Sequence, residues 1–335
     1  MRQIIHLLTI LLLLPAATAC TTPPQTQSQT RPGQSAIASA HPLATEAGHE
    51  ILARGGNAFD AAVALAAALA VVEPWNSGLG GGGFFLLHRA RDGFEVMIDA
   101  RERAPLAATR DMYLRDGRPV PALSIDGALA AGIPGTPAGL AHLAKKYGKL
   151  GLDQSLAPAI RLARDGFPAT PAYSKILLRQ HMRLTDHFPE AARAYLNEGL
   201  IPAPGDIATQ PELAQTLERL AENGQAGFYA GATAERLVQG VRAAGGIWSM
   251  KDLAGYRVIE REPVRGNYRG VRVTSASLPS SGGVVLVQML NLLQGFDLDG
   301  MPEAQRHHTV IEAMRLAYRD RARHLGDPDF VSVDV

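Results

Sequence analysis

Cysteine is almost absent from this sequence: its 335 residues include one, so no disulfide can form within the chain. An excess of charge of one sign is also lacking, because 33 Lys and Arg residues are balanced by 32 Asp and Glu residues. The overall charge therefore gives no indication of a nucleic-acid partner or a polybasic membrane patch. Apolar residues make up 46% and charged residues 19%, which is typical of a globular protein that can bury a sizeable core.

The N-terminal segment has the pattern of an export signal. Arg2 precedes an apolar stretch from Ile4 to Leu14, and small residues follow it up to Cys20. The stretch is too short to be a comfortable membrane span. Residues 1–19 are therefore predicted to be a signal peptide that directs the protein to the periplasm.

The end of this signal admits two interpretations. Ala17-Thr18-Ala19 fits ordinary cleavage and soluble export, whereas a small residue before Cys20 fits lipoprotein processing, which would lipidate that cysteine. Because a lone cysteine cannot form an internal disulfide, a lipid anchor at Cys20 is favoured. Residues 20–35 are rich in Pro, Gln and Thr and are predicted to form a disordered tether.

Helices dominate the predicted secondary structure of the remaining chain. Ala58 to Val72 is almost wholly apolar but has only 15 residues, so it is predicted to be a buried helix capped by Asn57. A helix is also predicted to start at Pro137, with Thr136 as its cap. Other helices are predicted at residues 43–54, 153–165, 171–186, 211–223, 232–244, 282–295 (buried) and 302–325. Strands are predicted at residues 84–88 and 94–102, joined by a hairpin turn, and as a second pair within 261–277.

The stretch "SGLGGGGFFLLH" contains a run of glycines. Gly78, Gly80 and Gly83 match the spacing G-x-G-x-x-G, which often marks a dinucleotide-binding turn. In such a turn a strand precedes the glycines and a helix follows them, so that the helix N-terminus faces the phosphates. Here the predicted order is the reverse. We therefore expect these glycines to permit left-handed φ angles and a close approach of another backbone segment or a ligand.

Long motifs in a fixed order surround this glycine run. They are "HPLATEAGHEILARGGNAFDAAVALAAALAVVEPWNSGLGGGGFFLLH", "IDARERAP", "AAGIPGTPAGL", "KYGKL", "LAPAIRLARDGFP", "QPELAQTLERLAENGQAGFYAG", "GGIWSMKDLAGY", "EPVRGNYRG", "LPSSGGVVLVQMLNLLQGFDL" and "EAMRLAYRDRARHLGDPDF". Together they resemble the γ-glutamyltransferase family, also called γ-glutamyltranspeptidases or glutathione hydrolases, over residues 36–335. The resemblance implies an α+β fold, the four-layer αββα sandwich of N-terminal-nucleophile hydrolases, of which this chain matches the large-subunit part.

The same resemblance implies an activity and a partner. In this family a precursor cleaves itself, and the new N-terminal threonine of the small subunit attacks the γ-glutamyl amide of glutathione and related donors. The γ-glutamyl-enzyme then passes its acyl group to water or to an amino acid, and no cofactor is needed. No motif before Val335 matches the small subunit. The nucleophilic threonine is therefore expected downstream, the domain at 36–335 is expected to be incomplete, and the chain alone is expected to be inactive.

One site residue of the large subunit is carried over by the resemblance. In "IDARERAP", Arg101 matches the arginine that grips the α-carboxylate of the γ-glutamyl group. A guanidinium can bind a carboxylate through two parallel hydrogen bonds, which also fixes its orientation. From spacing alone, an ion pair of Arg101 with Glu102 or Asp99 would be the simpler interpretation. The neighbouring Arg103 is expected to pack or pair elsewhere.

Other residues that attract attention do not predict a metal site. His307 and His308 are adjacent, so on a helix they point to different faces and lack the i, i+4 spacing of a helical zinc site. Asp327 and Asp329 are too few for a calcium site. The resemblance makes the Ser280–Gly283 stretch a loop of the family, and the simpler alternative is the capped start of a helix.

Two alternatives to a γ-glutamyl-cleaving enzyme remain open. The chain could be a non-catalytic lipoprotein remnant that binds a γ-glutamyl ligand through Arg101, or a relative of the cephalosporin acylases with another acyl group. Without a small subunit, we expect open sheet edges and partial exposure of helices such as Ala58–Val72.

Overall fold

The computed structural model describes residues 35–333. The predicted signal peptide at 1–19, the lipidation site Cys20 and nearly all of the predicted tether at 20–35 lie outside the described residues. By its internal contacts, the chain from Ile37 onward forms a single unit. Within the described range, no helix has both the length and the apolarity that crossing a membrane requires.

The start of α2 (Ala58–Val72) shows why the sequence forms a helix here. Asn57 Oδ1 accepts hydrogen bonds from two backbone N–H groups of the first turn, at 2.8 and 3.0 Å, and the Asp60 carboxylate accepts one from the N–H of Asn57 at 2.9 Å. The buried Asp60 carboxylate also accepts a hydrogen bond from the N–H of Lys149 (2.8 Å), just after α4 (Thr136–Lys146). One carboxylate thus caps α2 and ties it to the end of α4.

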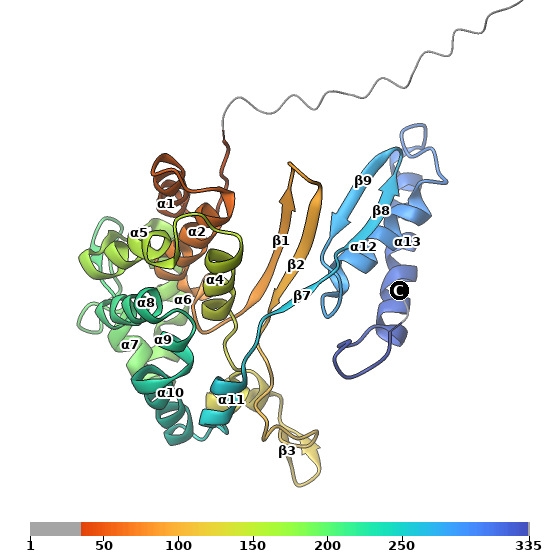
Figure 1. Cartoon of the computed structure of the whole chain (residues 1–335). Coiled ribbons are helices and arrows are strands. Elements are labelled where there is room, and N and C mark those ends of the chain that lie inside the picture. The colour runs from red at the N-terminus through yellow and green to blue at the C-terminus, as the bar shows by residue number, and fades with distance from the viewer. Residues whose placement is uncertain (1–34, 334–335) are drawn as a thin grey trace, which may run out of the picture. The chain divides into compact units, whose positions relative to one another are not determined.

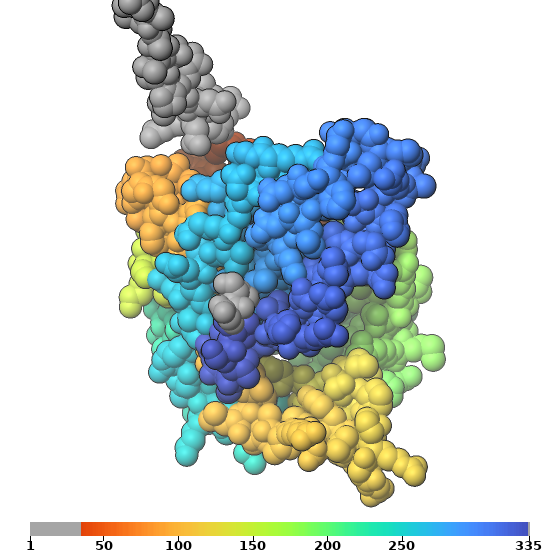
Figure 2. Space-filling model, turned by 90° about the vertical axis from the view of Figure 1, so that its right-hand side faces the viewer, coloured from red at the N-terminus to blue at the C-terminus, as the bar shows by residue number. Residues whose placement is uncertain are grey.

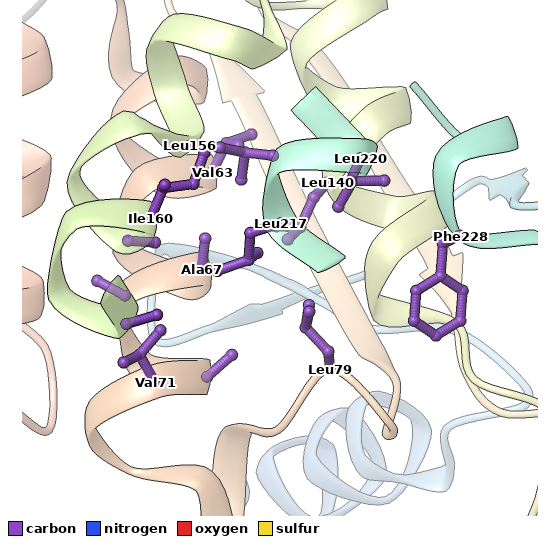
Figure 3. Close-up of a cluster of buried hydrophobic side chains, with 14 of the residues drawn as sticks. Val63, Ala67, Val71, Leu79, Leu140, Leu156, Ile160, Leu217, Leu220 and Phe228 are labelled. Carbon is purple, nitrogen blue, oxygen red and sulfur yellow. The ribbon is translucent and has the colours of Figure 1, made fainter. Parts of the chain in front are cut away.

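The hydrophobic core lies between α2 and three neighbouring helices. α1 (Pro42–Ala53) and α5 (Leu152–Asp165) contact α2 directly, and α8 (Pro211–Asn223) packs on α5. Figure 3 shows side chains of these helices pointing toward one another: Val63, Ala67, Leu156, Ile160, Leu217 and Leu220. Because α2 is apolar on all sides, it can occupy this central position.

A three-stranded antiparallel sheet lies beside the helices. β1 (Gly83–Arg89) and β2 (Phe94–Ala100) form the predicted hairpin, and β7 (Ile259–Arg261) adds to the other side of β2. The strand order is β1-β2-β7, so β1 is an edge strand within the described residues.

A second hairpin and two helices complete the layers. β8 (Val264–Tyr268) pairs with β9 (Val271–Ser275), and this hairpin is covered by α12 (Ser281–Leu293), which in turn contacts α13 (Glu303–His324). Figure 1 shows the order of layers: helices, the β1-β2-β7 sheet, the β8-β9 hairpin, and helices again. This order confirms the predicted αββα arrangement.

The remaining elements are short or peripheral. The helical elements are α3 (Pro74–Ser77), η1 (Pro121–Ser124), η2 (Ala128–Ala130), α6 (Pro171–His187), α7 (Pro189–Tyr195), α9 (Ala226–Tyr229), α10 (Gly231–Ala243) and α11 (Met250–Gly255). The strands are β3 (Leu114–Arg115), β4 (Arg118–Pro119), β5 (Phe167–Pro168) and β6 (Ile207–Ala208).

Two local predictions are wrong, and a third holds in part. Thr136 does not cap α4: the helix begins at Thr136, with Gly135 in the cap position and no side-chain hydrogen bond there. The central helix α2 is covered by its neighbours over most of its surface, but Leu65, Ala66 and Leu69 are partly exposed. The helix expected to be buried at 282–295 is only partly covered: Leu286 of α12 is 41% exposed.

Several large apolar side chains of α12, α13 and the turn between them are exposed. We call them the α12–α13 face: Leu286, Leu292, Phe296, Ile311, Met314 and Tyr318, which are 36–55% exposed. Figure 2 looks toward this side of the unit, where α12 and α13 form the blue surface. Large apolar side chains that stay exposed on neighbouring elements favour a protein–protein interface there.

Candidate functional site

The glycine segment, residues 78–83, connects α3 to β1 and is held at two points. Leu79 is 6% exposed and points into the helical core, as Figure 3 shows. The carbonyl of Gly81 accepts hydrogen bonds from the N–H groups of Gly135 (2.8 Å) and Thr136 (3.0 Å) at the start of α4. Those N–H groups are therefore already occupied, which argues against a phosphate site at this helix end.

Gly82 explains why this segment is rich in glycine. A Cβ at this position would lie 2.5 Å from the carbonyl oxygen of Ala100 and 2.6 Å from the backbone nitrogen of Glu102. The segment thus presses against the backbone on both sides of Arg101, as the prediction of close approach required. The other part of that prediction, a left-handed φ angle, is wrong: none of the glycines described in 78–83 has one.

Replacing Gly82 by alanine should destabilise the chain by about 1–3 kcal/mol, because the added methyl group forces the backbone around Arg101 to shift. The matched control is Gly80→Ala, where an added Cβ meets nothing within 4 Å. That variant should stay within about 0.5 kcal/mol of the original chain. Urea unfolding midpoints of the two variants measure the difference. Equal midpoints would show that the close approach at Gly82 does not matter.

Arg101 follows the end of β2 and lines a cavity of about 780 Å³. Its side chain is 53% exposed, and Nη1 lies 3.4 Å from Oε2 of Glu102. The ion pair with Glu102 that the spacing suggested is therefore present, whereas Asp99 pairs with Arg261 instead. Within residues 35–333 the Arg101 guanidinium donates no hydrogen bond, so its N–H groups remain available to a ligand carboxylate beside the ion pair with Glu102.

The backbone of Arg101 is clamped on both sides by side chains. Asp99 Oδ1 accepts a hydrogen bond from the Arg101 N–H (3.1 Å), and the Tyr256 hydroxyl donates one to the Arg101 carbonyl (2.8 Å). Burial, reinforced by the negative charge of Asp99, raises the pKa of the Tyr256 hydroxyl, which keeps it a proton donor. One local contact and one long-range contact thus fix the position from which the Arg101 side chain extends.

The clamp extends to the C-terminal part of the chain. Arg261 of β7 donates from Nε to Asp99 Oδ2 and from Nη2 to Asp329 Oδ1, both at 2.9 Å. Arg103 lies 3.8 Å from Asp329, with its guanidinium 5.7 Å from the Tyr256 ring centre. Arg103 therefore pairs and packs outside the cavity, while Arg101 lines it.

The other wall of the cavity is mainly apolar. Polar groups come from Arg101, Glu102 and Thr136, on the strand and α4 side of the glycine segment, and from Asn76 and Ser77 of α3. The other lining residues of the helical side are mainly apolar: Ala66, Leu69, Ala70, Pro74, Trp75, Tyr195 and Leu213. The site can therefore hold a ligand with a charged head and an apolar remainder. Sequence reasoning missed Trp75 and Tyr195, because neither stands in a motif with recognisable chemistry.

The residues set aside in the sequence have structural roles. Ser280 Oγ accepts a hydrogen bond from the N–H of Gly282 (3.2 Å) and caps α12. Asp329 is held by Arg261, and Asp327 accepts a hydrogen bond from the N–H of Asp329 (3.0 Å). Across the described part of the chain, no three His, Cys, Asp or Glu side chains converge as a metal site would require.

Sequence comparisons identify relatives of this chain. The profile of a family described as Gamma-glutamyltranspeptidase matches residues 44–335. The glutathione hydrolase proenzyme of Escherichia coli (strain K12) is 43% identical over 306 residues, which cover 90% of this chain and 53% of that protein. The Acylase ACY 1 proenzyme of Pseudomonas sp. (strain V22) is 39% identical over 306 residues, which cover 88% and 54%. The chain thus spans about half the length of the curated relatives it matches.

Structural comparison agrees with the sequence. The crystal structure of Helicobacter pylori gamma-glutamyltranspeptidase superimposes with a TM-score of 0.86 at 43% identity, over 90% of this chain and 88% of that one. A cephalosporin acylase from Bacillus halodurans reaches a TM-score of 0.82 at 32% identity, over 93% of this chain and 60% of that one. These likenesses confirm the predicted fold.

Proposed function

The chain belongs to the gamma-glutamyltranspeptidase family, and we propose that it is the large-subunit part of an enzyme that cleaves the γ-glutamyl amide of glutathione and related donors. The observation that carries this proposal is Arg101: its backbone is clamped, and its guanidinium lines an open cavity without making a hydrogen bond to any described residue. In this role Arg101 binds the donor's α-carboxylate and fixes the orientation of its acyl group.

The chemical step needs groups that the described residues do not bring to this cavity. Ser77 and Thr136 have hydroxyl groups there, but no histidine or lysine of the described chain lines the cavity to activate them. We propose that the N-terminal threonine of a small subunit supplies both the nucleophile and, through its α-amine, the base. The acyl group then passes to water or to an amino acid.

The surface of the chain supports such a partner. The α12–α13 face is apolar and exposed, and β1 presents an unpaired edge within the described residues, with Leu86 44% exposed. Relatives that match over half of their length are named proenzymes. A small subunit made from the same precursor is the partner that we propose for these surfaces.

A second candidate activity is glutaryl cleavage, since one relative is named an acylase and one structural neighbour a cephalosporin acylase. Both acyl groups carry a carboxylate for Arg101, but only the γ-glutamyl group also has an ammonium. The Arg101–Glu102 pair presents both signs of charge to the cavity, which suits a zwitterionic head.

The chain assembled with a small subunit should therefore hydrolyse γ-glutamyl-p-nitroanilide with a kcat/KM at least about tenfold above that for glutaryl-p-nitroanilide, a difference of about 1.4 kcal/mol. Glu102→Gln removes the negative charge and should lower the ratio of the two kcat/KM values. It should leave the contacts to the ring and the acyl chain of the donor unchanged. A preference for the glutaryl donor would replace the proposed activity with acylase activity.

We also propose that the protein is exported and anchored by a lipid at Cys20, on the basis of the signal and cysteine pattern alone. Cells fed a labelled fatty acid should incorporate the label into the wild-type protein and not into Cys20→Ser. An unlabelled wild type recovered in the soluble periplasmic fraction would support ordinary signal cleavage instead.

A further inference from the structure

A second, smaller hollow adjoins the Arg101 cavity. It has a volume of about 170 Å³ and is lined by Pro74, Trp75, Tyr173, Ile176, Leu177, Gln180, Leu184 and Tyr195. Pro74, Trp75 and Tyr195 line both hollows, so these side chains form the boundary between them. We propose that this smaller hollow, the aromatic annex, binds an apolar, ring-sized side chain carried by the amine partner of the γ-glutamyl group.

The walls of the annex select for apolar chemistry. Trp75 packs edge-on against Tyr173 with ring centres 5.7 Å apart, and Tyr173 packs in the same manner on Phe167 at 5.6 Å. Of the described side chains that line the annex, none is charged. A charged side chain would lose its hydration here without gaining a partner, whereas an apolar ring would gain contacts on several sides.

The size of the annex also fits a single ring. A protein cavity of about 150 Å³ lined by apolar side chains binds benzene, and the annex is of similar size. Because Pro74, Trp75 and Tyr195 line both hollows, a ring attached to a ligand in the Arg101 cavity can extend past them into the annex. Burying a ring in such a place should tighten binding on the order of tenfold or more.

Two phenol hydroxyls give the annex a polar element. Tyr173 and Tyr195 both line it, and neither hydroxyl is hydrogen-bonded to another residue of the described chain. Burial raises the pKa of both hydroxyls, so both stay protonated and can donate a hydrogen bond. A ring whose substituent accepts such a bond, for example a nitro group, would be held more firmly than a plain hydrocarbon.

The position of the annex next to the Arg101 cavity indicates which part of the ligand it binds. In the proposed function Arg101 binds the α-carboxylate end of the γ-glutamyl group. The annex, which lies past Trp75 and Tyr195, can then bind the group attached at the γ-carbonyl end, which is the amine of the donor's leaving group or of an acceptor. This inference rests on the proposed function, since it takes the γ-glutamyl head to be bound at Arg101.

Two ligands test it on the full chain by ligand-observed NMR titration. L-Glutamine carries the γ-glutamyl amide without a ring, and γ-glutamyl-p-nitroanilide carries the same head with one. The anilide should bind on the order of tenfold more tightly. Leu184→Trp fills the annex and should remove this advantage without weakening glutamine. The matched control is Leu178→Trp on the same helix, since Leu178 is 65% exposed and lies outside the annex lining.

Each outcome has a defined meaning. If both ligands bind equally, or if Leu184→Trp and Leu178→Trp behave alike, the annex proposal is wrong while the γ-glutamyl site stands. If neither ligand binds, the assignment of Arg101 fails, and the annex proposal fails with it. Should Leu184→Trp not fold, Gln180→Asp places a charge at an exposed position of the annex lining and should weaken the anilide selectively.

Discussion

Arg101→Ala should lower kcat/KM for γ-glutamyl-p-nitroanilide by on the order of 10²–10³-fold in the assembled enzyme. Two charge-assisted hydrogen bonds to the donor carboxylate are lost, which corresponds to about 2–4 kcal/mol of transition-state binding. Because the structure clamps the Arg101 backbone through Asp99 and Tyr256, a water molecule or neighbouring side chain cannot easily reproduce the lost geometry. Steady-state kinetics measure the effect.

Two further variants make this prediction specific. Arg101→Lys keeps the charge but not the planar pair of donors, so it should recover little of the lost activity. Arg110→Ala removes the same charge at an exposed position outside the cavity and should leave kcat/KM within about twofold of the original, as expected for an isolated surface change. An Arg101→Ala enzyme within threefold of the original would exclude Arg101 as the carboxylate ligand.

Residues 36–335 produced alone should neither hydrolyse nor transfer a γ-glutamyl group. Amide cleavage needs a nucleophile with an adjacent base and donors aimed at the oxyanion. The described cavity contributes orientation through Arg101 and has no histidine or lysine in its described lining. Production together with the small subunit of the Escherichia coli relative, which is 43% identical over the matched region, should restore turnover.

The outcomes of this experiment separate the remaining hypotheses. Turnover by the chain alone would reveal a nucleophile elsewhere and would overturn the proposed division of roles. A folded chain that binds glutamine but stays inactive with every small subunit tried would support the alternative of a non-catalytic γ-glutamyl binder. In a successful complex, the α12–α13 face should become protected from hydrogen exchange, because the partner covers it.

Local chemistry explains which parts of the fold could be predicted from sequence. The apolar stretch at Ala58–Val72 and its cap at Asn57 predicted α2 because helix periodicity and capping depend on neighbouring residues. The β1-β2 hairpin was predicted for the same reason. The extent to which each helix is buried could not be predicted in this way, since it depends on which elements meet: α2 is mostly covered within the chain, whereas α12 is only partly covered.

The sequence by itself determined the family, through long motifs in a fixed order, and singled out Arg101 within "IDARERAP". The tertiary structure alone decided how that arginine is presented. Tyr256 lies 155 positions from Arg101 along the chain, and Glu102 rather than Asp99 takes its charge. The annex between α3, α6 and α7 likewise joins residues from 74 to 195. Neither of two distant sequence segments indicates such a contact by itself, because the two partners come together only in the folded chain.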